Sequence, residues 1–266
     1  METNMLLSEI KGKVPTLILN RPEKRNSLSP DLLLLLHEKL EALTKEDQVR
    51  AVIIRGSGEK AFSSGYDIAA IPTNVSPELN KRLKHQNPLE IALSSVAGFP
   101  YPTIAMLNGY AFGAGCELAV SCDLRVGADN IRMGMPPAKL GLVYPVSGLL
   151  RFMRIVGVSK TKEIFLTARY FDAQRAKELG LVDYLVHSDK LADFTMNLAE
   201  EMAGNAPLSI KGTKKIVDML ASRIGVLTEA ESREAERIVI EAFNSEDLKE
   251  GQIAFLEKRK PEFKGR

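Results

Sequence analysis

The 266-residue sequence has few of the residues that bind metals or form disulfides. Its two cysteines, Cys116 and Cys122, lie close together in an apolar stretch and are too few for a disulfide framework in a chain of this size. Its three histidines, His37, His85 and His187, are isolated, and no histidine or cysteine lies near them at metal-ligand spacing. We therefore expect a reducing, cytoplasmic environment and no metal site.

The sequence also lacks long hydrophobic runs and an excess of charge of one sign. The leucine run at 32–36 is far shorter than a membrane span, and the N-terminal residues METNMLLSEIKGK do not have the basic and then apolar order of a signal peptide. Lys and Arg total 36 against 34 Asp and Glu, which gives a formal net charge of +2. Such a balance does not favour binding to nucleic acid or anionic lipid. We expect neither as a partner, so an anionic ligand has to be bound by local groups.

What the chain does contain is an alternation of strand and helix patterns. Ser29 followed by Pro30 is typical of a helix start, and the helix that it predicts lies between two buried-strand patterns. Strands are predicted at 14–20, 50–56, 102–109, 123–128 and 181–186, and further helices at 113–122, 147–156, 159–168 and 172–179. This order indicates an α/β fold. From residue 190 onward only amphipathic helical segments follow, at 227–243 and 246–260 among others, so we divide the chain into a core at 1–200 and a helical region at 201–266.

The segment AFSSGYD at 61–67 offers polar atoms without an obvious catalyst. No histidine lies nearby in the sequence to activate Ser63 or Ser64 as a nucleophile. The backbone amides of this turn are therefore the more promising chemical groups.

A second turn, GYAFGAGCE at 109–117, is rich in glycine. It is not a dinucleotide fingerprint, because Leu118 stands where the third glycine is needed, and it lacks the Gly-Lys-Ser/Thr of a phosphate loop. The pattern is a strand, a glycine turn and a helix start, whose first N–H groups have no intrahelical partner and carry the positive end of the helix dipole. The glycines could instead serve only close helix packing. Because both turns follow strands, two amide donors could converge at one edge of a sheet.

These two turns, with the loop RPEKRNSLS at 21–29, CDLRVGA at 122–128 and the tail FLEKRKPEF, resemble the crotonase (enoyl-CoA hydratase/isomerase) superfamily. The resemblance extends over essentially the whole chain. It implies a spiral of β-β-α units with a C-terminal helical trimerisation region, and a homotrimer or a dimer of trimers. It also implies an acyl-CoA thioester as substrate, so that coenzyme A is part of the substrate and no separate cofactor is needed.

The same resemblance implies roles for individual residues. The amides of Ser64 and Ala114 would form an oxyanion hole for the thioester oxygen, and each such donor is typically worth about 3 kcal/mol. Asp67 would brace its turn rather than catalyse. The residues implied to contact CoA are Lys24, Arg25, Ser27, Ser63, Tyr66, Ile68, Lys258 and Phe263, the last two sometimes from a neighbouring subunit. For Lys24 and Arg25 a solvated surface charge run is the alternative.

The reaction is less clear from the sequence, because one catalytic position departs from the pattern of the hydratases. Those enzymes use two glutamates; Glu117 matches the first, but Pro137 stands at the second and has no proton to give. The following residues, LGLVY at 140–144, resemble the Leu-Gly-x-x-Tyr loop of methylmalonyl-CoA decarboxylases. In the first turn, Tyr66 also stands where those decarboxylases have a histidine. Loss of CO2 from a malonyl thioester needs an oxyanion hole and a group such as the Tyr144 hydroxyl to orient the carboxylate, but no base.

Several readings therefore remain open. The preferred one is decarboxylation of a short malonyl-CoA-type substrate such as methylmalonyl-CoA, with Glu117 kept protonated by burial and able to protonate the enolate carbon. The alternatives are an enoyl-CoA hydratase or isomerase that uses Glu117 as acid and base, and a non-catalytic scaffold or RNA-binding protein of the same fold.

Overall fold

The computed structural model describes residues 4–46, 48–68, 87–222 and 228–264, and its larger sheet confirms the predicted α/β core. The strand order is β1-β2-β3-β5-β7-β10, with β1 antiparallel to β2 and all other neighbours parallel. The strands are β1 (Leu6–Lys11), β2 (Val14–Leu19), β3 (Val52–Gly56), β5 (Thr103–Leu107), β7 (Leu124–Ala128) and β10 (Tyr184–Val186). All five predicted strands are present with slightly shorter bounds, and β1 was missed because most of its residues are exposed.

A second, smaller sheet was not predicted. Its order is β4-β6-β8-β9, with strands β4 (Ala61–Ser63), β6 (Tyr110–Phe112), β8 (Arg132–Gly134) and β9 (Phe171–Asp172). Strands of two or three residues are too short to show an alternating pattern. The two turns therefore follow β4 and β6, which are parallel neighbours, and not the strands at 50–56 and 102–109 directly. The expectation that both turns end strands at one sheet edge is confirmed, but the sheet is a different one.

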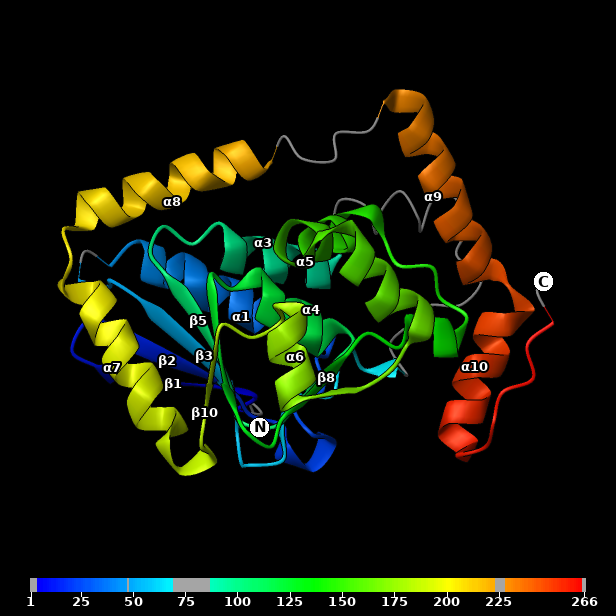
Figure 1. Cartoon of the computed structure of the whole chain (residues 1–266), viewed down its shortest axis with the longest axis horizontal. Helices are drawn as coiled ribbons and strands as arrows, with labels where there is room; N and C mark the ends of the chain where they lie inside the picture. The colour runs from blue at the N-terminus through cyan, green and yellow to red at the C-terminus, as the bar shows by residue number, and fades with distance from the viewer. Residues whose placement is uncertain (1–3, 47, 69–86, 223–227, 265–266) are drawn as a thin grey trace.

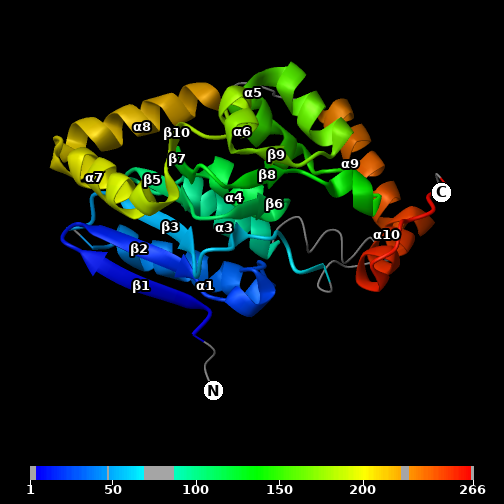
Figure 2. The ribbon, with the colours of Figure 1, turned by 60° about the horizontal axis from the view of Figure 1, so that its bottom comes forward.

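Helices cover both sheets, as Figures 1 and 2 show. The Ser29 side chain caps the first helix by accepting from the Leu32 amide, and Pro30 is its first residue, as predicted. The helices of the core are α1 (Pro30–Thr44), α3 (Pro88–Ala97), α4 (Ala114–Ser121), α5 (Val146–Thr167) and α6 (Ala173–Leu179). Every residue of α4 is buried, because its small side chains let neighbouring elements approach. The two helices predicted at 147–156 and 159–168 are one segment, broken by non-helical Gly157.

The C-terminal region is helical, as expected. It consists of α7 (Leu191–Gly204), α8 (Pro207–Ala221), α9 (Glu229–Asn244) and α10 (Glu246–Glu257). The boundary predicted at residue 200 falls within α7, which packs against β2, β3, β5 and β7. The predicted start at 227 lies in 223–227, outside the described residues. Figure 1 shows α8 and α9 along the outside of the molecule, and α8 has no buried residue.

Two further contacts fix the C-terminal helices. The Lys214 ammonium of α8 forms an ion pair with Asp123 and donates to the Tyr101 carbonyl. Helix α10 packs on the 3₁₀ turn η3 (Pro137–Leu140), where a side chain at Gly251 would collide with the Leu140 carbonyl. Within the described parts of the chain, no helix combines the length and apolar character that a membrane crossing requires.

The loop at 21–29 is held against the second sheet by one buried side chain. The Asn26 amide nitrogen donates to the Ser57 and Ala61 carbonyls at 3.0 and 2.8 Å. Its oxygen accepts from the Arg21 amide at 3.0 Å and from the Ser57 hydroxyl at 3.1 Å. Asn26 also has a φ of 55°, a left-handed conformation that asparagine tolerates better than most residues.

We expect Asn26→Ala to lower the free energy of unfolding by about 2 kcal/mol or more, because it leaves buried carbonyls without a donor and places alanine in a left-handed conformation. Urea denaturation measures this. Asn20→Ala is the matched control, since the Asn20 side chain makes one exposed bond to the Asn4 carbonyl. Equal stability of the two variants would contradict the anchoring role.

Candidate active site

The two turns after β4 and β6 lie in direct contact. Strands β4 and β6 pair through Ala61 with Tyr110 and Ser63 with Ala111. A β-carbon built on Gly65 would lie 2.8 Å from the Phe112 carbonyl and 3.7 Å from the Ala114 nitrogen, and one built on Gly115 would lie 2.6 Å from the Ser63 carbonyl. Glycine at these two positions is thus what allows the backbones to approach so closely.

In the first turn, three of the four successive amides already have acceptors. The Ser64 amide donates to the Arg25 carbonyl at 3.0 Å, the Gly65 amide to the Ser63 hydroxyl at 3.2 Å, and the Asp67 amide to the Leu28 carbonyl at 3.0 Å. Tyr66 is the exception, since its amide finds no acceptor within the described segments. The prediction of Ser64 as a free donor is therefore wrong, because the carbonyl of the neighbouring loop already accepts its N–H.

In the second turn, Ala114 is the first residue of α4. The Gly113 amide donates to the Gly134 carbonyl at 2.9 Å, and the first intrahelical bond runs from the Glu117 amide to the Gly113 carbonyl at 3.0 Å. The Ala114 amide has no acceptor within the described parts of the chain, as expected for the first N–H of a helix. The Tyr66 and Ala114 amides, one from each of the two touching turns, are thus both available as donors.

The loop at 21–29, predicted to contact CoA, lies beside the first turn, which contains Ser64. Besides the bond of the Ser64 amide to Arg25, the Ser64 hydroxyl donates to the Lys24 carbonyl at 3.3 Å. The Lys24 and Arg25 side chains are exposed. Ser27 is buried, and its carbonyl and hydroxyl accept from the Arg21 guanidinium at 2.7 and 3.1 Å, so its side chain supports the loop.

The remaining CoA-contact predictions meet different surroundings. Ser63 is fully buried, and half-buried Ile68 is the last residue described before 69–86. Asp67 braces the turn as predicted, through a 3.3 Å ion pair with Arg21. Lys258 ends α10 in a left-handed conformation and Phe263 is 43% exposed in the tail beyond it. In the described part of the chain, no hydrogen bond or ion pair joins these last two to the loop at 21–29.

Glu117 is the buried carboxyl next to the two amides. It lies one turn into α4, and its side chain is 3% exposed. The Tyr144 hydroxyl donates to one carboxylate oxygen, and the Arg151 guanidinium donates to the other at 2.9 Å. Burial raises the pKa of the Glu117 carboxyl above its ordinary value, although Arg151 and Tyr144 act in the opposite direction. The carboxyl therefore combines a raised pKa with a place in the first turn of the helix that begins at Ala114.

Arg151 and Glu90 were not predicted as site residues. Arg151 also forms an ion pair with Glu90 at the start of α3, and Glu90 accepts from the Ser147 hydroxyl at 3.0 Å. A single arginine in the apolar stretch GLLRFM at 148–153 is a signal that could have indicated a buried charge. Glu90 gives no such signal, because an acidic residue in the first turn after Asn87 and Pro88 is typical of any helix start.

Of the three positions used to choose between reactions, Glu117, Tyr144 and Pro137, the first two lie in contact. Tyr144 lies against Glu117, and a β-carbon on Gly148 would lie 2.4 Å from the Tyr144 ring and 2.9 Å from the Glu117 oxygen. Burial, with Glu117 nearby, raises the pKa of Tyr144 well above its ordinary value, so the hydroxyl stays protonated. Pro137 is buried in η3 under α10 and offers no acid or base.

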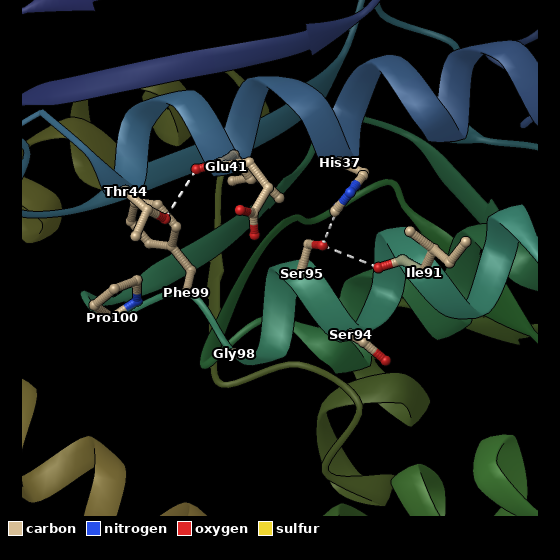
Figure 3. A pocket seen from close by; sticks show the side chains of 10 residues that line it. His37, Glu41, Thr44, Ile91, Ser94, Ser95, Gly98, Phe99 and Pro100 are labelled. Atoms are coloured by element: carbon tan, nitrogen blue, oxygen red, sulfur yellow. Dashed lines mark hydrogen bonds between the residues drawn. The ribbon is translucent and has the colours of Figure 1, made fainter. Parts of the chain in front are cut away.

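A surface hollow between α1 and α3 is separate from this cluster. Figure 3 shows His37 of α1 pointing toward Ser95 of α3, with the His37 ring 2.6 Å from the Ser95 hydroxyl. Its lining, drawn from the described residues, includes none of Tyr66, Ala114, Glu117 and Tyr144. Across the described ranges there is also no cluster of three His, Cys, Asp or Glu residues suited to a metal ion.

Comparison with known proteins identifies the family. Residues 9–266 match the enoyl-CoA hydratase/isomerase family. The chain belongs to this family, which is the crotonase superfamily. It is 33% identical over 276 residues to a short-chain-enoyl-CoA hydratase of Clostridium acetobutylicum, with all of both chains covered. As a crotonase, the chain is a CoA-thioester-processing enzyme, and its spiral fold is confirmed.

Solved crotonase structures of equal sequence identity to this chain differ in how closely their backbones superpose on it. A methylmalonyl-CoA decarboxylase in complex with 2-nitronate-propionyl-CoA is 31% identical and superposes with a TM-score of 0.92, with 99% of both chains covered. An enoyl-CoA hydratase from Bacillus anthracis, also 31% identical, reaches 0.75 with 99% of this chain and 100% of that chain covered. At equal identity, the backbone follows the decarboxylase more closely, which supports the resemblance found in the loop at 140–144.

We expect Gly148→Ala to lower the free energy of unfolding by about 1–3 kcal/mol and to separate Tyr144 from Glu117, because the added methyl group has no space between them. Denaturant titration measures the stability. Gly204→Ala is the control, because nothing lies within 4 Å of its site at the end of α7, and it should be neutral or stabilising by about 0.5–1 kcal/mol. A Gly148→Ala protein as stable as the control would refute this packing.

Proposed function

We propose that this crotonase decarboxylates a short malonyl-CoA-type thioester such as methylmalonyl-CoA. The observation that carries the proposal is the Tyr144 hydroxyl beside Glu117, with Pro137 where a second carboxylate would be needed for hydration. The TM-score of 0.92 to a methylmalonyl-CoA decarboxylase supports it. The substrate supplies its own CoA, and no other cofactor is required.

In this reaction the bond between the α-carbon and the carboxylate breaks, and its electron pair moves into the thioester to form an enolate. The amides of Tyr66 and Ala114 would stabilise the negative oxygen. Tyr144, whose hydroxyl donates to Glu117 in the ligand-free structure, would donate to the leaving carboxylate instead once Glu117 carries its own proton. The α-carbon then takes one proton, for which Glu117 in its protonated form is placed as the donor. The products are CO2 and the shortened acyl-CoA, and Glu117 regains its proton from water.

The CoA portion would lie along the loop that holds Lys24 and Arg25, whose carbonyls accept from Ser64. Exposed cations at this position suit the phosphates of CoA. Lys258 and Phe263 would reach CoA from a neighbouring subunit. The two cysteines are free and buried, which fits a reducing compartment, and we place the enzyme in the cytoplasm.

The second candidate is an enoyl-CoA hydratase or isomerase with Glu117 as the only acid and base. The favourable observation is that the relative from Clostridium acetobutylicum is a hydratase by name. An isomerase needs one group that moves a proton between two carbons, and one buried glutamate can do this.

For assembly we propose a homotrimer or a dimer of trimers. Helix α8 has several large apolar residues at the surface, and an exposed apolar surface of this kind often marks an interface. The most exposed of them are Leu208, Ile216, Val217, Met219 and Leu220.

If decarboxylation is the reaction, Tyr144→Phe should slow CO2 release about ten- to a thousandfold, because one positioned polar contact is lost. Glu117→Gln should slow it less, since no base is required to form the enolate. Mass analysis of the products from methylmalonyl-CoA, crotonyl-CoA and a 3-enoyl-CoA measures both variants. A hydratase or isomerase gives the reverse order, so loss of all activity in Glu117→Gln with Tyr144→Phe unaffected would exclude decarboxylation.

Light scattering should show the mass of a trimer or hexamer at micromolar concentration. Ile216→Glu should shift the protein toward smaller species, because it places a charge on the apolar face of α8. Lys215→Glu, one residue away on the same helix, is the charge control. A wild-type monomer at this concentration would contradict the proposed assembly.

A further inference from the structure

Arg151 lies between two carboxylates that come from different helices. One of its guanidinium nitrogens donates to the Glu117 carboxylate at 2.9 Å and to the Glu90 carboxylate at 3.0 Å, and the other nitrogen pairs with Glu90. Side-chain exposure falls from 39% at Glu90 to 14% at Arg151 and 3% at Glu117. The three residues therefore form a path of charged groups from the surface to the buried carboxyl.

The geometry of Arg151 is fixed from the Glu90 side. Besides Arg151, the Glu90 carboxylate accepts from the Ser147 hydroxyl at 3.0 Å and the Ser94 hydroxyl at 3.2 Å. Although burial alone would raise the pKa of Glu90, its bonds to Arg151 lower it below the ordinary value, so Glu90 is ionised. An ionised carboxylate held by two hydroxyls keeps the planar guanidinium in one orientation.

The charges of the three groups do not cancel. Arg151 remains protonated, so two ionised carboxylates would leave the three groups with one surplus negative charge. Glu117 is the more buried of the two, and there the effects oppose one another: burial raises its pKa, Arg151 lowers it and Glu90 raises it. Whether Glu117 holds a proton thus depends on two residues that are not themselves placed to react.

Other groups also surround Glu117. The Tyr144 hydroxyl, from the segment before α5, donates to it and lowers its pKa by more than Glu90 raises it. Cys116, on the same helix, is a buried thiol whose pKa burial raises to about 12, so it stays neutral. Arg125 of β7 is engaged with Asp183 at 2.6 Å.

We propose that Arg151 is a positioning residue that orients the Glu117 carboxyl and sets its charge, and that Glu90 adjusts this effect from the surface side. The inference deepens the proposed function, because it concerns the group that exchanges a proton with the acyl carbon. It applies equally to decarboxylation, hydration and isomerisation. In each of these reactions the orientation and the protonation state of Glu117 determine whether it can give a proton to the acyl carbon or take one from it.

Two substitutions should move the titration of Glu117 in opposite directions. Arg151→Met removes the cation and should shift the midpoint to higher pH, whereas Glu90→Gln removes a negative charge, keeps an oxygen that accepts from Arg151, and should shift the midpoint to lower pH. Infrared difference spectroscopy of the carboxyl band, with Glu117→Gln to assign it, measures this in ligand-free protein. Arg154→Met, on the exposed side of the same helix, is the matched control and should leave the midpoint unchanged.

The same variants separate this inference from the proposed reaction. Turnover at neutral pH should fall about tenfold to a hundredfold in Arg151→Met, because Glu117 loses its orientation, and Arg151→Lys should restore the midpoint more than the turnover. A merely structural ion pair predicts lower stability with an unmoved midpoint in both variants, and that result would overturn the inference. If Arg151→Met does not fold, an unmoved midpoint in Glu90→Gln overturns it alone. Opposite shifts in a protein that releases no CO2 from methylmalonyl-CoA would support the inference and refute the decarboxylase.

Discussion

The central constraint of this structure is the burial of a carboxyl group among donors that it shares with other elements. Glu117 can lie inside α4 only because Tyr144 and Arg151 both donate to it. That requirement links α4 to Tyr144 just before α5 and to Arg151 within α5, and through Arg151 to Glu90 of α3. Three helices are thus placed relative to one another by one group that would be unfavourable without them.

The close approach of the two glycine turns is a second constraint on the site. Gly65 and Gly115 let the ends of β4 and β6 touch, and parallel pairing of these strands points both chain segments toward the same place. In the first turn, the Ser64, Gly65 and Asp67 amides all have acceptors in the surrounding chain. The Tyr66 amide is therefore the one that remains available. In a turn of this kind, availability of an N–H is decided by what the surrounding loops accept.

The sequence predicted the parts of this fold that depend on local pattern. Continuous apolar strands such as 14–20 and a capped helix at Ser29 have signatures that neighbouring residues complete by themselves. The second sheet could not be predicted, because strands as short as Phe171–Asp172 exist only through their partners. The motifs pointed to Ala114, Glu117 and Tyr144, of which Glu117 and Tyr144 are in contact, whereas Arg151 and Glu90 meet across segments with no fixed spacing. The choice between the Ser64 and Tyr66 amides depended in the same way on the distant Arg25 carbonyl.

The bonds from Ser64 to the carbonyls of Lys24 and Arg25 affect which residues of the loop can be exchanged during evolution. They are accepted by main-chain oxygens, which every amino acid has, so these two bonds do not depend on the exposed side chains of Lys24 and Arg25. Exchange of Lys24 or Arg25 can therefore alter how strongly the far end of a substrate is bound without displacing the reacting oxygen. In the proposed CoA-binding loop, the affinity for CoA and the position of the turn can therefore change independently during evolution.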